Sequence, residues 1–115
     1  MPTPAHASSK PDTPACDRVA KTARAVGWPV RELQTLRRIA ARESSCNTLA
    51  LNPLDPTIYG SRGLMQINGS NVRYLVNRGI IRNADDLYNP TRNLRAALAL
   101  WKLYGWRPWS GASHA

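Results

Sequence analysis

Glu43 is the residue whose place in the sequence most directly predicts chemistry. The segment from Pro29 to about Ser44 has helical spacing, and on a wheel of about 100° per residue Glu43 falls on the same side as Leu36 and Ile39. Glutamate is seldom buried without a partner or a role. Burial raises the pKa of a carboxyl group, and a carboxyl that keeps its proton can act as a general acid. Two simpler interpretations stay open, in which Glu43 pairs with an arginine or caps the following loop.

The opposite side of the same helix is predicted to face water. The residues on that side are Arg31, Gln34, Arg38, Ala41 and Arg42. Three of these five are arginines, so the helix is expected to be amphipathic, with its charge in solvent and its apolar stripe in the core.

A second group of residues with binding chemistry lies in the block Gly63-Leu64-Met65-Gln66-Ile67-Asn68. Gln66 and Asn68 can each donate and accept hydrogen bonds, as an acetamido group requires. The apolar members of the block are equally consistent with plain core packing. Around the block, from residue 46 to 69, the helical period is lost and Gly, Pro and Asn are frequent, which predicts turns or a small hairpin.

Several common kinds of site are excluded by the sequence. It has no glycine-rich phosphate loop and no zinc-spaced cluster. His6 and His114 lie near the two ends, which argues against a triad or metal site built on them. At 115 residues the chain is also too short for a doubly wound cofactor enzyme with a substrate domain. We therefore expect neither a cofactor nor a metal.

The charge balance is strongly basic, with 16 Lys and Arg against 7 acidic residues and a net charge of +9. Such a surface attracts polyanions: nucleic acid, anionic lipid, or a cell wall that carries teichoic acid and peptide carboxylates. The basic residues are spread over all segments and no nucleic-acid-binding motif is present, so a nucleic-acid partner is not expected. No apolar run approaches the roughly 18 residues of a transmembrane helix, so no membrane span is expected.

The remaining pattern predicts a mainly α chain: one small helical domain over residues 14–110, with one loop-rich or short β-hairpin segment. Residues 1–13 are expected to be a mobile arm and residues 111–115 a tail. The predicted helices, besides the one at 29–44, run from Thr13-Pro14 to Gly27, from a Ser70 cap to Gly79, for one turn at 84–87 after Asn83, and from Asn89-Pro90 to Gly105.

The order of three motifs resembles the lysozyme-like superfamily, most closely the soluble lytic transglycosylase type of bacterial cell-wall proteins and phage virions. Glu43-Ser44 ends a helix, and the glycine of the Gly63–Asn68 block follows 20 residues later. Tyr88-Asn89-Pro90 then opens a helix that leads into Gly105-Trp106-Arg107-Pro108-Trp109-Ser110, as in actinobacterial and actinophage versions. The resemblance covers residues 20–110 and implies an α+β lysozyme-like fold, with the loop-rich segment beside the active-site groove.

The resemblance also implies an activity, the cleavage of the β-1,4 bond between N-acetylmuramic acid and N-acetylglucosamine. Glu43 would be the catalytic acid, Ser44 would orient it or contact the sugar, and Gln66 would hold an N-acetyl group. The implied substrate-binding residues are Ser44, Ser61, Met65, Gln66, Asn68, Tyr104 and Trp106, while Trp101 is expected in the core. The implied partner is a peptidoglycan glycan strand. The chain is expected to act as a monomer outside the cytoplasm, as a cell-wall, secreted or virion protein such as an endolysin. The first 15 residues show no signal-peptide pattern.

Two departures from the family pattern keep alternatives open. The family's later Ala-Tyr-Asn motif, whose tyrosine bonds the acid, is missing, and Tyr88 or Tyr104 is the candidate substitute. With one carboxylate we expect a transglycosylase, in which the muramyl 6-hydroxyl closes a 1,6-anhydro ring. A hydrolytic lysozyme needs a second carboxylate, for which Asp55 is the candidate, although its proline-flanked setting also fits a turn. The alternatives of another class are an inactive wall-binding module and a basic nucleic-acid-binding module.

Cys16 and Cys46 are predicted to form a disulfide. If the first two helices pack antiparallel, the start of one lies beside the end of the other, which brings the two cysteines together. An enzyme that works outside the reducing cytosol can keep such a bond, and a loop of this length makes it worth about 3–4 kcal/mol on the chain-entropy model. Two buried thiols are the alternative.

Overall fold

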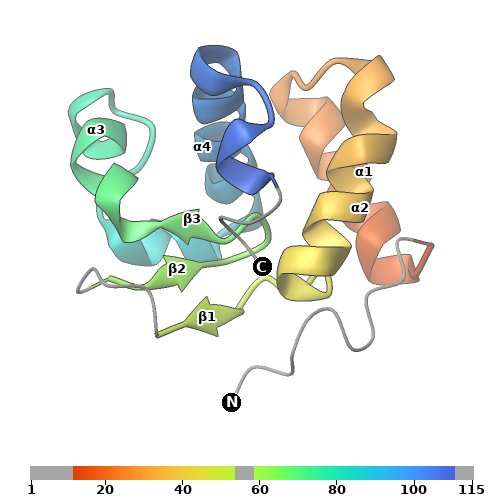
Figure 1. Ribbon diagram of the computed structural model, residues 1–115, viewed down its shortest axis with the longest axis horizontal. Helices are drawn as coiled ribbons and strands as arrows, with labels where there is room; N and C mark the ends of the chain where they lie inside the picture. The colour runs from red at the N-terminus through yellow and green to blue at the C-terminus, as the bar shows by residue number, and fades with distance from the viewer. Residues whose placement is uncertain (1–11, 54–58, 111–115) are drawn as a thin grey trace.

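The computed structural model describes residues 12–53 and 59–110, and most of these are helical (Figure 1). The helices are α1 (Pro14–Val26), α2 (Leu33–Ser44), α3 (Val72–Asn77) and α4 (Pro90–Tyr104), with 3₁₀ turns at Val30–Glu32, Gly69–Asn71, Ala84–Tyr88 and Arg107–Trp109. Three two-residue strands, β1 (Leu51–Asn52), β2 (Ser61–Arg62) and β3 (Ile67–Asn68), form an antiparallel sheet in the order β1-β2-β3. The prediction of a mainly α fold with one short β segment is confirmed. Residues 1–11 of the expected arm, the expected tail at 111–115, and Asp55 lie outside the described residues.

The helices begin at residues whose side chains satisfy free backbone N–H groups. Thr13 Oγ1 accepts a hydrogen bond from Cys16 N at 3.2 Å before α1. Asn89 Oδ1 accepts one from Arg92 N at 3.0 Å before α4, as predicted. The expected Ser70 cap is wrong: Asn68 Oδ1 accepts from Ser70 N at 2.8 Å, because a 3₁₀ turn precedes α3.

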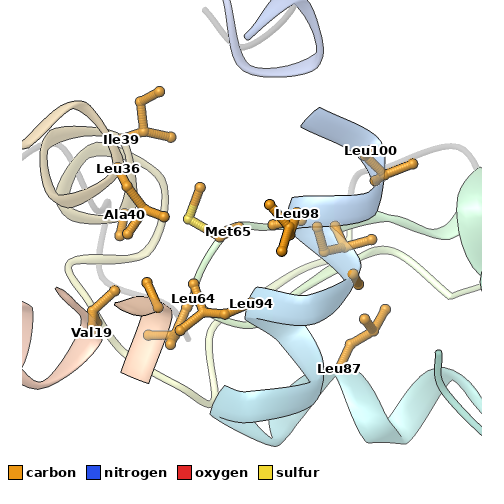
Figure 2. Close-up of a cluster of buried hydrophobic side chains, with 14 of the residues drawn as sticks. Val19, Leu36, Ile39, Ala40, Leu64, Met65, Leu87, Leu94, Leu98 and Leu100 are labelled. Carbon is orange, nitrogen blue, oxygen red and sulfur yellow. The ribbon is translucent and has the colours of Figure 1, made fainter. Parts of the chain in front are cut away.

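The hydrophobic core lies between α2, the Gly63–Asn68 segment and α4 (Figure 2). Leu36, Leu64 and Leu94 are fully buried there. The expectation that Ala41 faces water is wrong, since it is only 1% exposed. Helix α1 also packs against α2, so the buried face of α2 is wider than the stripe that the sequence predicted.

The sheet is tied to the turn before α4 by Arg62 on β2. Its guanidinium lies over the rings of Tyr59 and Tyr88, at 5.9 and 5.3 Å from their centroids, and pairs with Asp85 at 2.7 Å. In the same turn Asp86 accepts hydrogen bonds from the side chain and backbone N–H of Arg82, and these lower the pKa of Asp86 to about 2. Since the pKa of Asp86 is lowered, this contact is kept until the pH falls toward that value.

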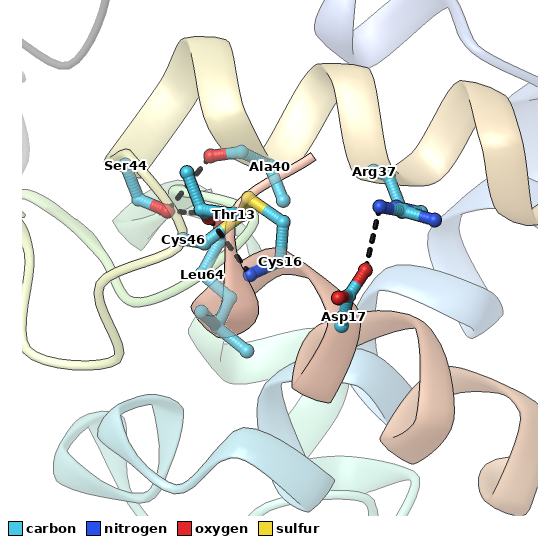
Figure 3. Close-up of a disulfide and its surroundings, with 8 residues drawn as sticks. All are labelled: Thr13, Cys16, Asp17, Arg37, Ala40, Ser44, Cys46 and Leu64. Atoms are coloured by element: carbon cyan, nitrogen blue, oxygen red, sulfur yellow. Dashed lines mark hydrogen bonds and ion pairs between the residues drawn. A yellow bond between two sulfur atoms is a disulfide. The ribbon is translucent and has the colours of Figure 1, made fainter. Parts of the chain in front are cut away.

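The predicted disulfide between Cys16 and Cys46 is present, with Cα atoms 5.3 Å apart (Figure 3). It joins the first turn of α1 to the residues just after α2. Along the same pair of helices Arg37 Nη2 donates to Asp17 Oδ1 at 2.7 Å. The start of α1 is therefore fixed beside the end of α2, where Glu43 lies.

Candidate active site

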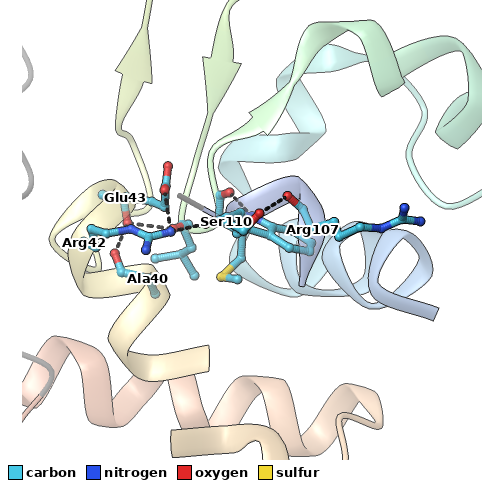
Figure 4. A network of polar contacts seen from close by, with 9 residues as sticks. Ala40, Arg42, Glu43, Arg107 and Ser110 are labelled. Carbon is cyan, nitrogen blue, oxygen red and sulfur yellow. Dashed lines mark hydrogen bonds and ion pairs between the residues drawn. The ribbon is translucent and has the colours of Figure 1, made fainter. Parts of the chain in front are cut away.

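Glu43 occupies the last turn of α2, and its side chain is 10% exposed. Its Oε2 accepts a hydrogen bond from Arg42 Nη2 at 3.1 Å, so the pairing with an arginine that the sequence left open is present. In Figure 4 the carboxylate lies on the side of α2 from which the sheet strands extend. A carboxylate in this position is largely shielded by protein, but it still reaches the surface.

The sequence predicted that Arg42 faces water. Arg42 is exposed, but its side chain also makes contacts within the protein. The same Nη2 that contacts Glu43 also donates to the backbone carbonyl of Trp109 (Figure 4). Trp109 belongs to the 3₁₀ turn Arg107–Trp109 that follows α4. Arg42 therefore links the candidate acid to the C-terminal turn.

Ser44 ties α2 to the Gly63–Asn68 segment. Ser44 is 4% exposed, and its hydroxyl donates to Leu64 O at 2.8 Å and lies 3.0 Å from Ala40 O (Figure 3). Directly after it, Ser45 and Cys46 have φ of 55° and 56°, a left-handed conformation that non-glycine residues seldom adopt. This sharp reversal ends α2 at Ser44, which leaves the last turn of the helix, with Glu43, beside the segment.

The Gly63–Asn68 segment holds three of the predicted site residues, and two of them, Met65 and Gln66, are buried. Gln66 is 9% exposed and its Nε2 donates to Ala50 O at 3.2 Å and Gly63 O at 3.1 Å. Met65 is fully buried, and in Figure 2 its side chain points between α2 and α4. Burial favours the core-packing alternative for Met65 over a place in the groove.

Two further predicted residues face each other on neighbouring strands. Ser61 on β2 is the Cα partner of Asn68 on β3. Ser61 is 9% exposed, and Asn68 is half-buried with its Oδ1 on Ser70 N. The sheet thus brings Ser61 and Asn68 to the same place as Gln66, which precedes β3 directly.

The aromatic residues after residue 100 divide into packed and exposed ones. Trp106 stacks on Trp28 with ring centroids 5.4 Å apart, and its Nε1 donates to Glu32 at 3.0 Å. Trp101 packs against the core, as predicted. Tyr104, at the end of α4, is 47% exposed. These contacts favour packing for Trp106 and leave Tyr104 accessible to a ligand.

Asn93 is a residue that the sequence analysis did not select. It is fully buried, and its Oδ1 accepts from Met65 N at 3.0 Å while its Nδ2 donates to Arg62 O at 3.0 Å and Leu87 O at 2.9 Å. The signal was present: Asn93 is a polar residue four positions before Ala97, on the apolar face of the last predicted helix. It positions the Gly63–Asn68 segment against α4.

The three motifs that are far apart in the sequence meet in the structure. Ser44 Oγ reaches Leu64 O, Trp109 Nε1 donates to Met65 O at 2.8 Å, and Arg42 donates to Trp109 O. Each motif is thereby bonded to the other two, and Glu43 lies at the junction. The described residues contain no group of three or more His, Cys, Asp or Glu that could hold a metal ion. Within the same ranges, no helix is long and apolar enough to cross a membrane.

The model of the transglycosylase SLT domain family matches residues 25–106. That range takes in Glu43, the Gly63–Asn68 segment and α4. A comparison with curated proteins and one with solved structures gave no match. Because the match covers well over half of the chain and includes Glu43 and the Gly63–Asn68 segment, the chain belongs to the transglycosylase SLT domain family, the lytic transglycosylases that act on peptidoglycan outside the cytoplasm.

Proposed function

We propose that Glu43 is the general acid and base of this transglycosylase, which cleaves the β-1,4 bond between N-acetylmuramic acid and N-acetylglucosamine. The observation that carries the proposal is the junction of the three motifs: a largely shielded carboxylate lies where Ser44, Arg42 and Trp109 bond α2 to two other segments. A catalytic group held by packed, hydrogen-bonded neighbours keeps a productive geometry.

The proposed reaction has two steps that use the same carboxyl group. Protonated Glu43 donates its proton to the glycosidic oxygen as the bond from that oxygen to muramyl C1 breaks, through an oxocarbenium-like transition state. The muramyl 6-hydroxyl oxygen then bonds to C1, and the Glu43 carboxylate takes the hydroxyl proton. The product is a 1,6-anhydro ring, no water is consumed, and Glu43 regains its proton for the next cycle.

Arg42 and Ser44 are proposed as positioning residues. Arginine carries five N–H donors in a fixed planar arrangement, so Arg42 can hold the Trp109 carbonyl and orient the Glu43 carboxylate together. Ser44 acts through its contact with Leu64 O, which fixes the distance between the acid and the Gly63–Asn68 segment.

The N-acetyl group is proposed to bind at the sheet, near Ser61, Gln66 and Asn68. The Nε2 of Gln66 is held by two carbonyls, which points its Oε1 away from them and leaves that oxygen to accept from an acetamido N–H. Exposed Tyr104 offers a further contact for the sugar. Met65 and Trp106 support the site through packing.

The remaining described carboxylates support a mechanism with one acid. Four of them have partners of their own: Asp17 with Arg37, Glu32 with Trp106, Asp85 with Arg62, and Asp86 with Arg82. A nearby second carboxylate is what a hydrolytic enzyme would need. We therefore expect anhydro products.

Mass spectrometry of soluble products from purified cell walls tests the proposal. The native chain should release muropeptides that end in 1,6-anhydromuramic acid. Glu43→Gln keeps the shape and removes the acid, and it should lower the initial release rate about a hundredfold or more. Asp12→Asn, the same change at an exposed carboxylate before α1, is the matched control and should keep the native rate. The melting temperature of each variant confirms that it is folded.

Two results would contradict the proposal in different ways. Retained wall cleavage by folded Glu43→Gln would remove Glu43 from the chemistry. Reducing-end muramic acid without anhydro products would identify a hydrolase instead, and Asp55→Asn would then test the second carboxylate.

A further inference from the structure

A cavity of about 490 Å³ lies between the end of α1, the end of α3 and one face of α4. It is lined by Val26 from α1, by Tyr74 and the residues after α3, and by side chains of α4. None of its lining residues belongs to α2, to the sheet or to the Arg107–Trp109 turn. The cavity is therefore separate from the candidate active site, and the proposed reaction makes no use of it.

The cavity is strongly cationic. Arg78, Arg92, Arg95 and Lys102 line it, and no acidic residue does. Within residues 12–53 and 59–110, none of these four cations lies within ion-pair distance of a carboxylate, although five other arginines do. Like charges held together repel one another, and a bound anion relieves that repulsion.

The cations are arranged in a row and not around a point. Arg92, Arg95 and Lys102 share one face of α4, and at about 1.5 Å per residue the row extends along roughly 15 Å of the helix. Arg92 Nη1 is fixed by a hydrogen bond to Ile80 O at 3.1 Å. A row of this length matches several successive charges on a linear polyanion better than it matches a single small anion.

The rest of the lining indicates which polyanion fits. The other side chains are mainly apolar: Val26, Ile80, Leu98, Ala99 and Leu103. The lining contains no Ser, Thr, Asn or Gln that could pair with peptide amides. Tyr74 is the one aromatic lining residue, and the Arg78 guanidinium lies 5.8 Å from its ring centroid, so it offers no clear face for a base to stack on. Phosphates joined by short polyol units fit this lining, because the phosphates can contact the cations while the carbon-bound hydrogens of the polyol lie on the apolar floor.

We propose that this cavity binds the polyol phosphate chain of a teichoic-acid-type wall polymer. The proposal rests on the family's peptidoglycan substrate and not on the role of Glu43. In walls that carry such polymers, they lie beside the glycan strands, so binding at a second site would raise the effective concentration of the enzyme at its substrate. The cavity would act as a wall-retention site.

Binding of soluble poly(glycerol phosphate) to the full chain tests the proposal without any cleavage step. Arg95→Gln with Lys102→Gln removes two of the four cations and should weaken binding about tenfold or more. It should also lower the slope of log K against log salt by about 2, since each lost phosphate contact removes about 1. Lys21→Gln with Arg38→Gln, exposed on α1 and α2, makes the same charge change outside the cavity and should leave affinity within about threefold.

A charge-conserving variant and a parallel binding measurement with single-stranded DNA complete the test. Arg95→Lys with Lys102→Arg should keep the native affinity, which tests whether charge is what the polymer requires, and the melting temperature of each variant confirms that it is folded. The proposal is overturned if the polymer does not bind or if the cavity and control pairs weaken binding equally. It is also overturned if single-stranded DNA of equal charge binds more tightly and loses affinity in the cavity pair, which would identify a nucleic-acid site.

Discussion

Arg42 shows how much of the candidate site depends on contacts that the local sequence pattern does not contain. The helical period placed Glu43 beside the apolar stripe, because position on a helix depends only on neighbours a few residues away. The partner of Arg42 is the Trp109 carbonyl, 67 residues later in the chain. No periodicity links two residues at that distance, so the wheel assigned Arg42 to solvent.

We expect Arg42→Lys to slow the chemical step. A lysine ammonium is a point charge on a flexible stem and cannot hold two acceptors in a fixed plane as a guanidinium does. The carboxylate would keep a positive neighbour but lose its orientation, which should lower kcat about tenfold with little change in KM. Initial rates over a range of wall concentrations measure both quantities.

Arg38→Lys is the matched control, since Arg38 lies on the same helix and is exposed. It should keep native kcat and KM. An unchanged kcat in Arg42→Lys would show that orientation by Arg42 has no part in catalysis.

At the scale of elements, the sequence predicted the helices and the presence of one short β segment, but not the positions of the strands. The starts of α1, of the Ala84–Tyr88 turn and of α4 follow from cap residues directly before them, so local sequence determines them. Strands of two residues are too short to show alternation. The contact of Asn93 Nδ2 with Arg62 O, which fixes β2 against α4, joins residues 31 positions apart and leaves no local pattern in the sequence.

Gly63, directly after β2, lies close to Leu87 of the Ala84–Tyr88 turn and to Asn93 of α4. Its φ is 79°, and a Cβ added there would lie 2.2 Å from Leu87 O and 2.3 Å from Asn93 Nδ2. Gly63→Ala must therefore displace either backbone or the buried amide. We expect a loss of about 3 kcal/mol or more in the free energy of unfolding, measured by denaturant titration.

Gly79→Ala separates the effect of crowding from that of backbone strain. Gly79 has φ of 72°, and nothing lies within 4 Å of an added Cβ. Only the left-handed backbone penalty remains, about 1–2 kcal/mol. Equal losses at the two glycines would mean that the close approach at Gly63 contributes nothing to stability.

At the scale of the whole molecule, the sequence predicted the family and the Cys16–Cys46 bond, but not the individual contacts between the motifs. The order of the motifs indicated the family, and antiparallel packing of the first two helices indicated the Cys16–Cys46 bond, which is present. Which face of each motif meets the others was not predictable, because Trp109 and Asn93 reach Met65 from segments 44 and 28 residues away.

Removal of the disulfide should destabilise the whole domain. In Cys16→Ala with Cys46→Ala the unfolded chain regains the freedom of a loop whose ends are 30 residues apart, which corresponds to a loss of about 3–4 kcal/mol in the free energy of unfolding. Alanine is preferred to serine because both sites are buried and a hydroxyl there would need a partner. Denaturant unfolding of oxidised native chain and variant measures the difference, and equal midpoints would contradict it.

The Cys16–Cys46 disulfide also changes the product of proteolysis. We expect a protease to cut in the turn between α1 and α2, because Arg31 in that turn is exposed. This turn lies inside the loop that Cys16 and Cys46 close. A nick in that turn breaks the backbone but leaves the two pieces joined through sulfur. The N-terminal helix then stays attached beside Glu43, and the nicked chain should migrate as one species on a gel until a reductant separates it.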